Sequence, residues 1–208
     1  MSWSALVLGN GGHSKVVIDL LLGQGIEVAA TISLSAAEPY RGVPALVGED
    51  RLRDFSTSGH RCVVAIGDNA ARMRAADSVR QAGFAVAGVV GAGAIVSPTV
   101  AIGDGTVIMN GAVVNADARI GALCILNTGA TVDHDCVIGD GVHLAPGSHL
   151  AGGVTIGAGS FLGVGVSVIP GIAIGEGVVV GAGGVVVTDI ESGSRVAGVP
   201  ARPIRTGG

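Results

Sequence analysis

A histidine between two aspartates, in the segment Asp133-His134-Asp135, is the group in this sequence best suited to proton transfer. The pKa of an unperturbed imidazole is about 6.5, so His134 can accept a proton near neutral pH. A neighbouring carboxylate can fix the tautomer of the ring and raise its basicity. The same residues also fit a simpler interpretation, a solvated histidine at a bend. The sequence therefore offers His134 as a candidate general base.

The three cysteines are weaker candidates for chemistry. Cys62, Cys124 and Cys136 form neither a CxxC motif nor a paired spacing, which argues against a disulfide framework and against a zinc site. Cys124 and Cys136 fall at positions that we expect to be buried corners, so neither suits the role of a nucleophile. We expect no metal.

A six-residue repeat must position these groups. Starting at Val96, an aliphatic residue recurs at every sixth position without a slip. The sixteen positions are Val96, Ile102, Ile108, Val114, Ile120, Leu126, Val132, Ile138, Leu144, Leu150, Ile156, Leu162, Val168, Ile174, Val180 and Val186. A small or β-branched residue precedes each by two positions, and glycine follows most of them by three. The pattern predicts a solenoid.

The pattern predicts one short strand and one bend for each hexad. The aliphatic residue points inward, the small residue fits a tight corner, and glycine accepts the backbone angles of the bend. A six-residue period fits a triangular coil of three strands, so sixteen hexads make about five coils, stacked about 4.8 Å apart. His134 then lies at a bend, two positions after the inward Val132, while His143 lies one coil above Ile125.

Residues 1 to about 88 lack this period and alternate between strand-like and helix-like segments. We expect strands over 4–8, 27–32 and 61–66, and helices over 13–22 and 69–82, the second closed by Gly83. This alternation predicts a small α/β domain with a parallel sheet. We place one domain at residues 1–90 and the solenoid, with a C-terminal tail, at residues 91–208.

A glycine-rich turn, Gly9-Asn10-Gly11-Gly12-His13, joins the first strand to the first helix. Free backbone N–H groups at a helix start can receive a phosphate. The turn lacks the third glycine of GxGxxG, which disfavours NAD.

Composition excludes several classes of protein. Of 208 residues, 37 are glycine and five are aromatic, yet proline is too rare for collagen and the apolar fraction of 49% too high for disorder. Glycine or a polar residue interrupts every apolar stretch before it could span a membrane. Twelve basic residues, with Lys15 the one lysine, face sixteen acidic ones, so we expect no nucleic-acid partner. No signal peptide is expected, which favours a cytoplasmic protein.

Four features together point to a family: the unbroken hexads, the GNGGHS turn, the segment NTGATVDHDCVIGDGVHLAPG over 127–147, and the ending AGVPARPI over 197–204. With these features, nearly the whole chain resembles the bacterial nucleotide-amino-sugar N-acetyltransferases of the left-handed β-helix (hexapeptide-repeat) acyltransferase superfamily. The resemblance implies a Rossmann-like βαβ domain followed by a left-handed parallel β-helix. It also implies a homotrimer, with acetyl-CoA between neighbouring subunits.

The resemblance assigns roles to three residues of the 127–147 segment. It implies that His134 is the general base, that Asp135 is its partner, and that His143 donates a hydrogen bond to the thioester end of acetyl-CoA. A surface or interface histidine is the alternative for His143. His149 shares the hexad phase of His143 one face further round, and we interpret it as structural.

Other positions correspond to acetyl-CoA contacts in the resembling enzymes. Asn127 matches a site asparagine, with a bend-stabilising amide as the alternative. Backbone groups at Gly163-Val164 and at Ala182 would hold the pantetheine arm, unless these positions serve only coil packing. Arg202 and Arg205 could meet the CoA phosphates or belong to a solvated tail.

The N-terminal domain would hold the nucleotide-linked sugar. The resemblance carries over four contacts: Gly11, Gly12, His13 and Gly67. Relatives usually have two acidic residues at the end of the second strand, where this chain has Ser33 and Leu34. Ser33 is thus a candidate substrate contact. It does not decide whether the nucleoside of the substrate is uridine, thymidine or guanosine.

The expected reaction is direct attack of the sugar amine, expected at carbon 4, on acetyl-CoA, without an acyl-enzyme. One alternative is an O-acetyltransferase that acts on sialic acid or a polysaccharide hydroxyl. A second alternative is a non-catalytic binding solenoid, since fold does not fix function.

Overall fold

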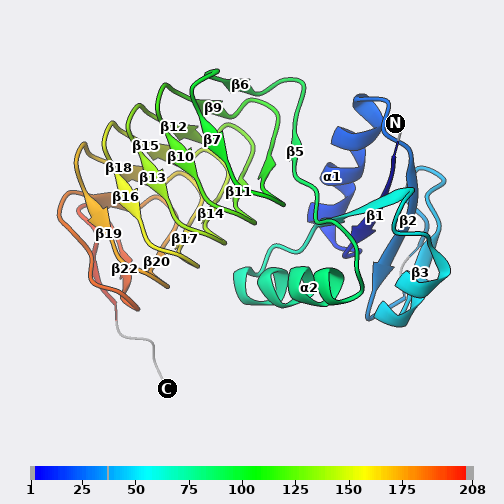
Figure 1. Cartoon of the computed structure of the whole chain (residues 1–208). Coiled ribbons are helices and arrows are strands. Elements are labelled where there is room, and N and C mark those ends of the chain that lie inside the picture. The colour runs from blue at the N-terminus through cyan, green and yellow to red at the C-terminus, as the bar shows by residue number, and fades with distance from the viewer. Residues whose placement is uncertain (1–2, 37, 205–208) are drawn as a thin grey trace. The chain divides into compact units, whose positions relative to one another are not determined.

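The computed structural model describes residues 3–36 and 38–204, and the chain divides into two compact units, residues 1–92 and 93–208 (Figure 1). The first unit is an α/β domain, and the second is a left-handed β-helix built from the hexads. Both parts of the predicted fold class are therefore confirmed.

A four-stranded parallel sheet in the order β3-β2-β1-β4 organises the first unit. Its elements are β1 (Ser4–Leu8), α1 (Gly12–Gly23), β2 (Val28–Ser33), β3 (Ala45–Val47), the 3₁₀ helix η1 (Glu49–Asp54), β4 (His60–Val64), α2 (Asn69–Gln81) and β5 (Val89–Val90). The central strand β1 is an unbroken apolar run from Ala5 to Leu8, at most 2% exposed, as a strand covered on both faces requires.

Several boundaries in this unit differ from prediction, most by one residue, and β3 and η1 are not predicted. The second strand is displaced by one residue, and the strand predicted over 61–66 ends at Val64. The chain leaves the sheet there because the Ile66 and Gly67 carbonyls accept hydrogen bonds from the Arg72 guanidinium, at 3.0 and 3.1 Å. The sequence predicts no element over the segment of β3 and η1, because a three-residue edge strand is too short to show alternation.

The second unit stacks two-residue strands into three parallel sheets (Figure 1). From β6 to β21, each strand residue pairs with the one 18 positions along the chain, so Ile125 lies between Val107 and His143 as the period predicts. The strands are β6 (Ile95–Val96), β7 (Ala101–Ile102), β8 (Val107–Ile108), β9 (Val113–Val114), β10 (Arg119–Ile120), β11 (Ile125–Leu126), β12 (Thr131–Val132), β13 (Val137–Ile138), β14 (His143–Leu144), β15 (His149–Leu150), β16 (Thr155–Ile156), β17 (Phe161–Leu162), β18 (Ser167–Val168), β19 (Ala173–Ile174), β20 (Val179–Val180), β21 (Val185–Val186), β22 (Arg195–Ala197) and β23 (Arg202–Pro203).

The hexad aliphatics and the small corner residues form one apolar core along the solenoid. Cys124 and Cys136 are fully buried at corners, as predicted. Two inward positions are less covered: Ile102 is 38% exposed and Val96 is partly buried. Both belong to the first coil, and a terminal repeat has a neighbouring coil on one side only.

Bends take a left-handed backbone conformation at the third residue after each inward position from Ile102 to Val180. Every glycine predicted there has φ between +61° and +77°. Asp117, Leu123 and Asp135 occupy the same position without glycine and still have φ of 62°, 57° and 60°. Between the first and last bends of the repeat, the stacked coils therefore hold this conformation even where the residue is not glycine.

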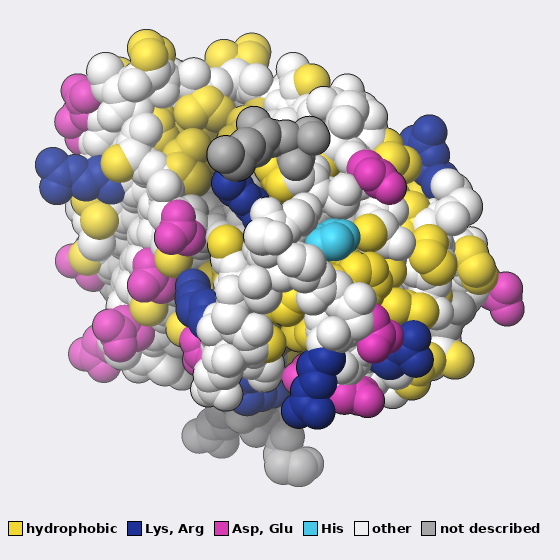
Figure 2. Space-filling view, turned by 45° about the vertical axis from the view of Figure 1, so that its right-hand side comes forward, with side chains coloured by type: hydrophobic (Ala, Val, Ile, Leu, Met, Phe, Trp, Pro, Cys, Tyr) yellow, Lys and Arg dark blue, Asp and Glu magenta, His cyan; other side chains and the backbone are white. Residues whose placement is uncertain are grey.

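After β21 the six-residue period breaks. The predicted tail includes β22, which pairs with β20, and β23, which returns antiparallel to β22. Within the described residues, no helix combines the length and apolar character needed to cross a membrane. Basic and acidic side chains are interspersed over the face shown in Figure 2, without a stripe of one sign.

Candidate active site

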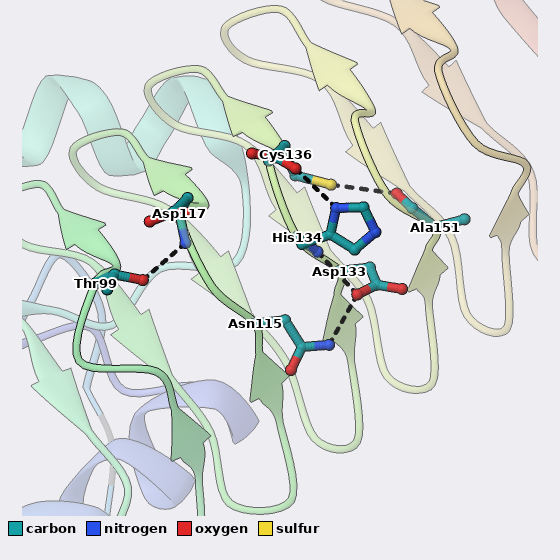
Figure 3. A network of polar contacts seen from close by, with 8 residues as sticks. Thr99, Asn115, Asp117, Asp133, His134, Cys136 and Ala151 are labelled. Atoms are coloured by element: carbon teal, nitrogen blue, oxygen red, sulfur yellow. Dashed lines mark hydrogen bonds and ion pairs between the residues drawn. The ribbon is translucent and has the colours of Figure 1, made fainter.

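The bend between β12 and β13 presents His134 to solvent, with its side chain 62% exposed (Figure 3). Its Nδ1 lies 2.8 Å from Oδ2 of Asp135. An ionised carboxylate only accepts hydrogen bonds, so Nδ1 carries the hydrogen and Nε2 carries the lone pair. Nε2 is therefore the atom of this ring that can take a proton from a substrate.

The second carboxylate of the bend, Asp133, binds the backbone and not the ring. Its Oδ1 accepts hydrogen bonds from the His134 N–H at 2.8 Å and from Nδ2 of Asn115 at 2.9 Å (Figure 3). Asn115 is the residue 18 positions earlier, one coil away at the same edge of the solenoid. These two hydrogen bonds lower the pKa of Asp133, with Asn115 as the larger cause.

Both carboxylates raise the pKa of His134 above its usual value. The hydrogen bond to Asp135 is the main cause, and the charge of Asp133 comes second. The ring therefore becomes a stronger base, and its charged form is stabilised once a proton arrives.

Further contacts tie adjacent coils together along this edge. Oγ1 of Thr99 accepts from the Asp117 N–H at 2.9 Å, and the Cys136 thiol donates to the Ala151 carbonyl at 3.2 Å (Figure 3). Contacts between neighbouring coils thus stabilise the edge of the solenoid that contains the His134 bend.

A second pair of predicted residues, Asn127 and His143, meets on the sheet that contains β11 and β14. Asn127 Nδ2 lies 3.1 Å from His143 Nε2, and Asn127 Oδ1 accepts from the Thr128 N–H at 2.9 Å. The second contact orients the amide, so Nε2 of His143 accepts and its hydrogen is on Nδ1. His143 is buried, and its ring packs edge-on against Phe161 with centroids 5.2 Å apart.

The other predicted acetyl-CoA positions share a column of bends with Asn127. Val164 and Ala182 belong to bends that follow β17 and β20, in the same column as the bend after Asn127. A Cβ on Gly163 would lie 2.7 Å from the Ala182 backbone nitrogen, so close coil packing accounts for this glycine. Within one chain, this column and the His134 bend lie at different edges of the triangular coil.

Three predicted residues lie apart from both groups or cannot be placed. Nδ1 of His149 is 3.0 Å from Oγ1 of Thr131, in the coil before it, which fits a structural role. Arg202 is exposed and binds the Ala201 carbonyl. Arg205 lies outside the described residues.

The glycine-rich turn of the first unit leads into α1, with Gly11 at the N-cap and Gly12 as the first helical residue. Position 9 requires glycine for two reasons. Its φ of +117° is one that other residues rarely adopt, and a Cβ there would lie 2.6 Å from the Ala65 carbonyl oxygen. Nε2 of His13 is buried without a hydrogen-bond partner among the described residues. Burial, and secondly the charge of Arg72, lower the pKa of His13 to about 4.

A cavity of about 340 Å³ opens at the carboxyl ends of β1 and β2, beside α2. Its walls are apolar residues such as Leu8 and Ile66, and it contains one acidic and one basic side chain, Glu49 and Arg74. Of the predicted substrate contacts, Ser33 lines it, whereas Gly11, Gly12, His13 and Gly67 do not. The Ser33 hydroxyl donates to the Ser35 carbonyl at 2.6 Å.

Sequence reasoning missed Glu49 and Arg74. Glu49 follows an unassigned strand, and Arg74 lies on the amphipathic α2, where an arginine is ordinary. The available signal was the position of Glu49, which lies two residues after the end of β3. Within the described part of the chain, no cluster of three His, Cys, Asp or Glu side chains is arranged to hold a metal ion.

Family models match both units. The PglD N-terminal domain matches residues 4–79, the six-repeat bacterial transferase hexapeptide matches residues 135–166, and the hexapeptide repeat of succinyl-transferase matches residues 153–189. No curated protein matches the chain.

Solved structures match over nearly the whole length of the chain. A variant of GDP-perosamine N-acetyl transferase from Caulobacter crescentus, in complex with CoA and GDP-perosamine, is 43% identical over 97% of each chain, with a TM-score of 0.94. The acetyltransferase domain of PglB from Neisseria gonorrhoeae FA1090, in complex with acetyl coenzyme A, is 36% identical over 98% of this chain and 100% of that one, with a TM-score of 0.92. WeeI from Acinetobacter baumannii AYE is 25% identical over 98% and 100%, with a TM-score of 0.91.

Proposed function

The chain belongs to the nucleotide-amino-sugar N-acetyltransferases of the hexapeptide acyltransferase superfamily, and we propose that it acetylates the 4-amino group of a GDP-linked deoxy sugar with acetyl-CoA. One observation carries the proposal: the His134-Asp135 pair leaves the Nε2 lone pair open at a bend of the solenoid. The alternative of a non-catalytic solenoid is set aside, because relatives at 43% and 36% identity are acetyltransferases.

In the proposed reaction, the amine nitrogen attacks the thioester carbonyl carbon of acetyl-CoA while Nε2 of His134 takes one amine proton. The carbon–sulfur bond then breaks, and the imidazolium returns this proton to the sulfur. The products are the N-acetylated sugar and the CoA thiol. Asp135 holds the ring and stabilises its charged form.

His143 and Asn127 are proposed to hold the thioester end of acetyl-CoA. In this proposal His143 donates a hydrogen bond to the acetyl carbonyl, and the contact with Asn127 orients its ring. Val164 and Ala182 would line the path of the pantetheine arm, in the same column of bends. Since this column and the His134 bend lie at different edges of one chain, we propose that each site forms between two subunits of a homotrimer.

The α/β unit is proposed to bind the nucleotide. Gly11, Gly12, His13 and Gly67 remain proposed contacts near the start of α1, and Ser33 a proposed contact in the cavity. The relative solved with GDP-perosamine favours guanosine.

Glu49 supports the same choice of base. Guanine presents two adjacent donors, N1–H and the 2-amino group, which a carboxylate can accept together. Uracil and thymine present one N–H between two carbonyl oxygens. Both of these oxygens repel a carboxylate. A cavity whose one acidic side chain is Glu49 therefore fits guanine best.

The test is release of CoA thiol from acetyl-CoA with GDP-, UDP- and dTDP-linked 4-amino sugars and free sialic acid. We expect turnover with the GDP-sugar, loss of about 100-fold or more in His134→Ala, and unchanged turnover in the control His60→Ala. Glu49→Gln should lose preference for GDP over UDP. Turnover with sialic acid alone would instead establish the O-acetyltransferase alternative.

A further inference from the structure

Two consecutive glycines, Gly152 and Gly153, occupy the bend one coil beyond His134. Gly153 is the expected bend glycine, with φ of +70°. Gly152 corresponds to His134 itself, 18 positions earlier, and its φ is not positive. Neither the six-residue rule nor the backbone conformation therefore explains Gly152.

The space beside Gly152 is filled by the imidazole of His134. A Cβ at position 152 would lie 2.6 Å from both Cε1 and Nε2 of His134 and 3.2 Å from Nδ1. Real Cβ contacts essentially never fall below 3.0 Å, and ordinary contacts begin at 3.4 Å. The ring thus lies directly against the backbone of Gly152.

Other glycines of the solenoid have a different reason to lack a side chain. A Cβ on Gly103, Gly139 or Gly157 would meet backbone atoms of the next coil at 2.4–2.7 Å. Those glycines allow the coils to stack. For Gly152, the three nearest atoms all belong to the His134 ring, so a side chain there would move the ring before it disturbed the stack.

The ring is also held by the bend itself. Asp135 holds Nδ1 at 2.8 Å, and Asp133, anchored by Asn115, holds the backbone N–H of His134 (Figure 3). The imidazole is therefore confined between these contacts and the surface of Gly152.

We propose that Gly152 is a positioning residue for His134: its missing side chain leaves the space in which the imidazole can lie with Nδ1 on Asp135 and Nε2 toward the substrate. The inference rests on the proposed role of His134 as the base. Restoring ordinary contact after addition of a methyl group requires the ring to move by about 1 Å, and a misplacement of that size costs about 100-fold in rate.

The experiment compares Gly152→Ala with wild type by kcat, by thermal unfolding, and by NMR titration of the His134 ring. We expect kcat to fall about 100-fold, an unchanged unfolding temperature, and a lower pKa of His134 because the contact with Asp135 is weakened. The control is Gly93→Ala, whose added Cβ would meet the Asn110 side chain at 3.2 Å, and it should keep wild-type kcat.

The double variant His134→Ala/Gly152→Ala separates the two proposals. If Gly152 acts through the ring, the second substitution has no further effect once the ring is gone. An equal loss in both backgrounds, or wild-type kcat and titration in Gly152→Ala, would overturn the positioning role. Full activity in His134→Ala alone would overturn the proposed function instead.

Discussion

Two carboxylates act on His134 by different routes. Asp135 accepts the Nδ1 hydrogen and so selects the tautomer, whereas Asp133 touches the backbone and contributes charge. Both stabilise the imidazolium that follows proton transfer. The same stabilisation means that the ring keeps its proton up to a higher pH. The neutral form, which is the active one, therefore predominates only at a higher pH than for an ordinary histidine.

The pH dependence of turnover should report this balance. In wild type, kcat/KM is expected to fall as the pH decreases, with a midpoint above the usual 6.5 because the pKa of His134 is raised. In Asp135→Asn the main cause of that rise is removed, so the midpoint should move to lower pH. Asparagine tolerates the φ of +60° at this position, which keeps the bend intact.

The plateau of the Asp135→Asn profile should also fall, by about 10- to 100-fold, because the ring loses its fixed tautomer. Initial rates of thiol release between pH 5 and 9 measure both effects. A midpoint that stays in place or rises in Asp135→Asn would contradict the assignment of His134 as the titrating base.

At the scale of elements, each strand of the solenoid is stabilised by one inward residue. Ile156 in β16 and Ile102 in β7 belong to the same sheet and have the same position in their hexads, but Ile156 is 1% exposed and Ile102 is 38% exposed. We expect Ile156→Ala to lower the free energy of unfolding by about 2–5 kcal/mol and Ile102→Ala by less than half as much. Denaturant unfolding monitored by circular dichroism compares them, and equal losses would contradict the difference in burial.

The start of α1 makes the first unit sensitive to acid. The pKa of His13 is about 4 in the folded chain and about 6.5 when unfolded, so the unfolded state binds more protons between these values. We therefore expect the free energy of unfolding to be unaffected by His13 above pH 6.5 and to decrease as the pH falls toward 4, by about 3 kcal/mol in total.

His13→Gln cannot titrate and should lose less stability over the same pH range. Unfolding by urea at several pH values, followed with a probe in the first unit, measures the slope. Parallel slopes in wild type and His13→Gln would show that other groups cause the acid sensitivity.

Elements were predictable where a period was strong. The hexads give strands, corners, bends and the 18-residue pairing, since one short-range rule repeats without interruption. The edge strand β3 and the closing strands β22 and β23 were not predictable, because each is fixed by pairing with a neighbour and not by its own pattern.

The same limit applies to the candidate site. The contact of His134 with Asp135 joins adjacent residues and follows from their order, whereas Asn115 and Gly152 contribute from other coils. Their position beside the bend can be predicted when the 18-residue spacing is applied to polar positions as well as to apolar ones. The place of Glu49 in the cavity could be predicted only if β3 were recognised as a strand.

At the scale of the whole molecule, the proposed catalytic pair and the proposed acetyl-CoA column occupy different edges of one solenoid. A rigid stack of coils cannot bring two edges together, so the proposed function predicts that one chain alone holds two half-sites. Rotational symmetry can place one edge of a subunit against a different edge of the next, which yields three equivalent sites in a closed trimer. Light scattering should therefore give a mass three times that of the 20.2 kDa chain.

Subunit mixing tests the arrangement directly. His134→Ala and His143→Ala each remove one half-site, so each homotrimer should be inactive. After denaturation and refolding of an equal mixture, about three quarters of the trimers contain both variants, and each of these has one intact site in three, which predicts about a quarter of wild-type activity. A site contained in one chain would give no recovery, because every chain then carries a defect of its own. Refolded wild type gives the full activity for this comparison, and each variant refolded alone gives the background activity.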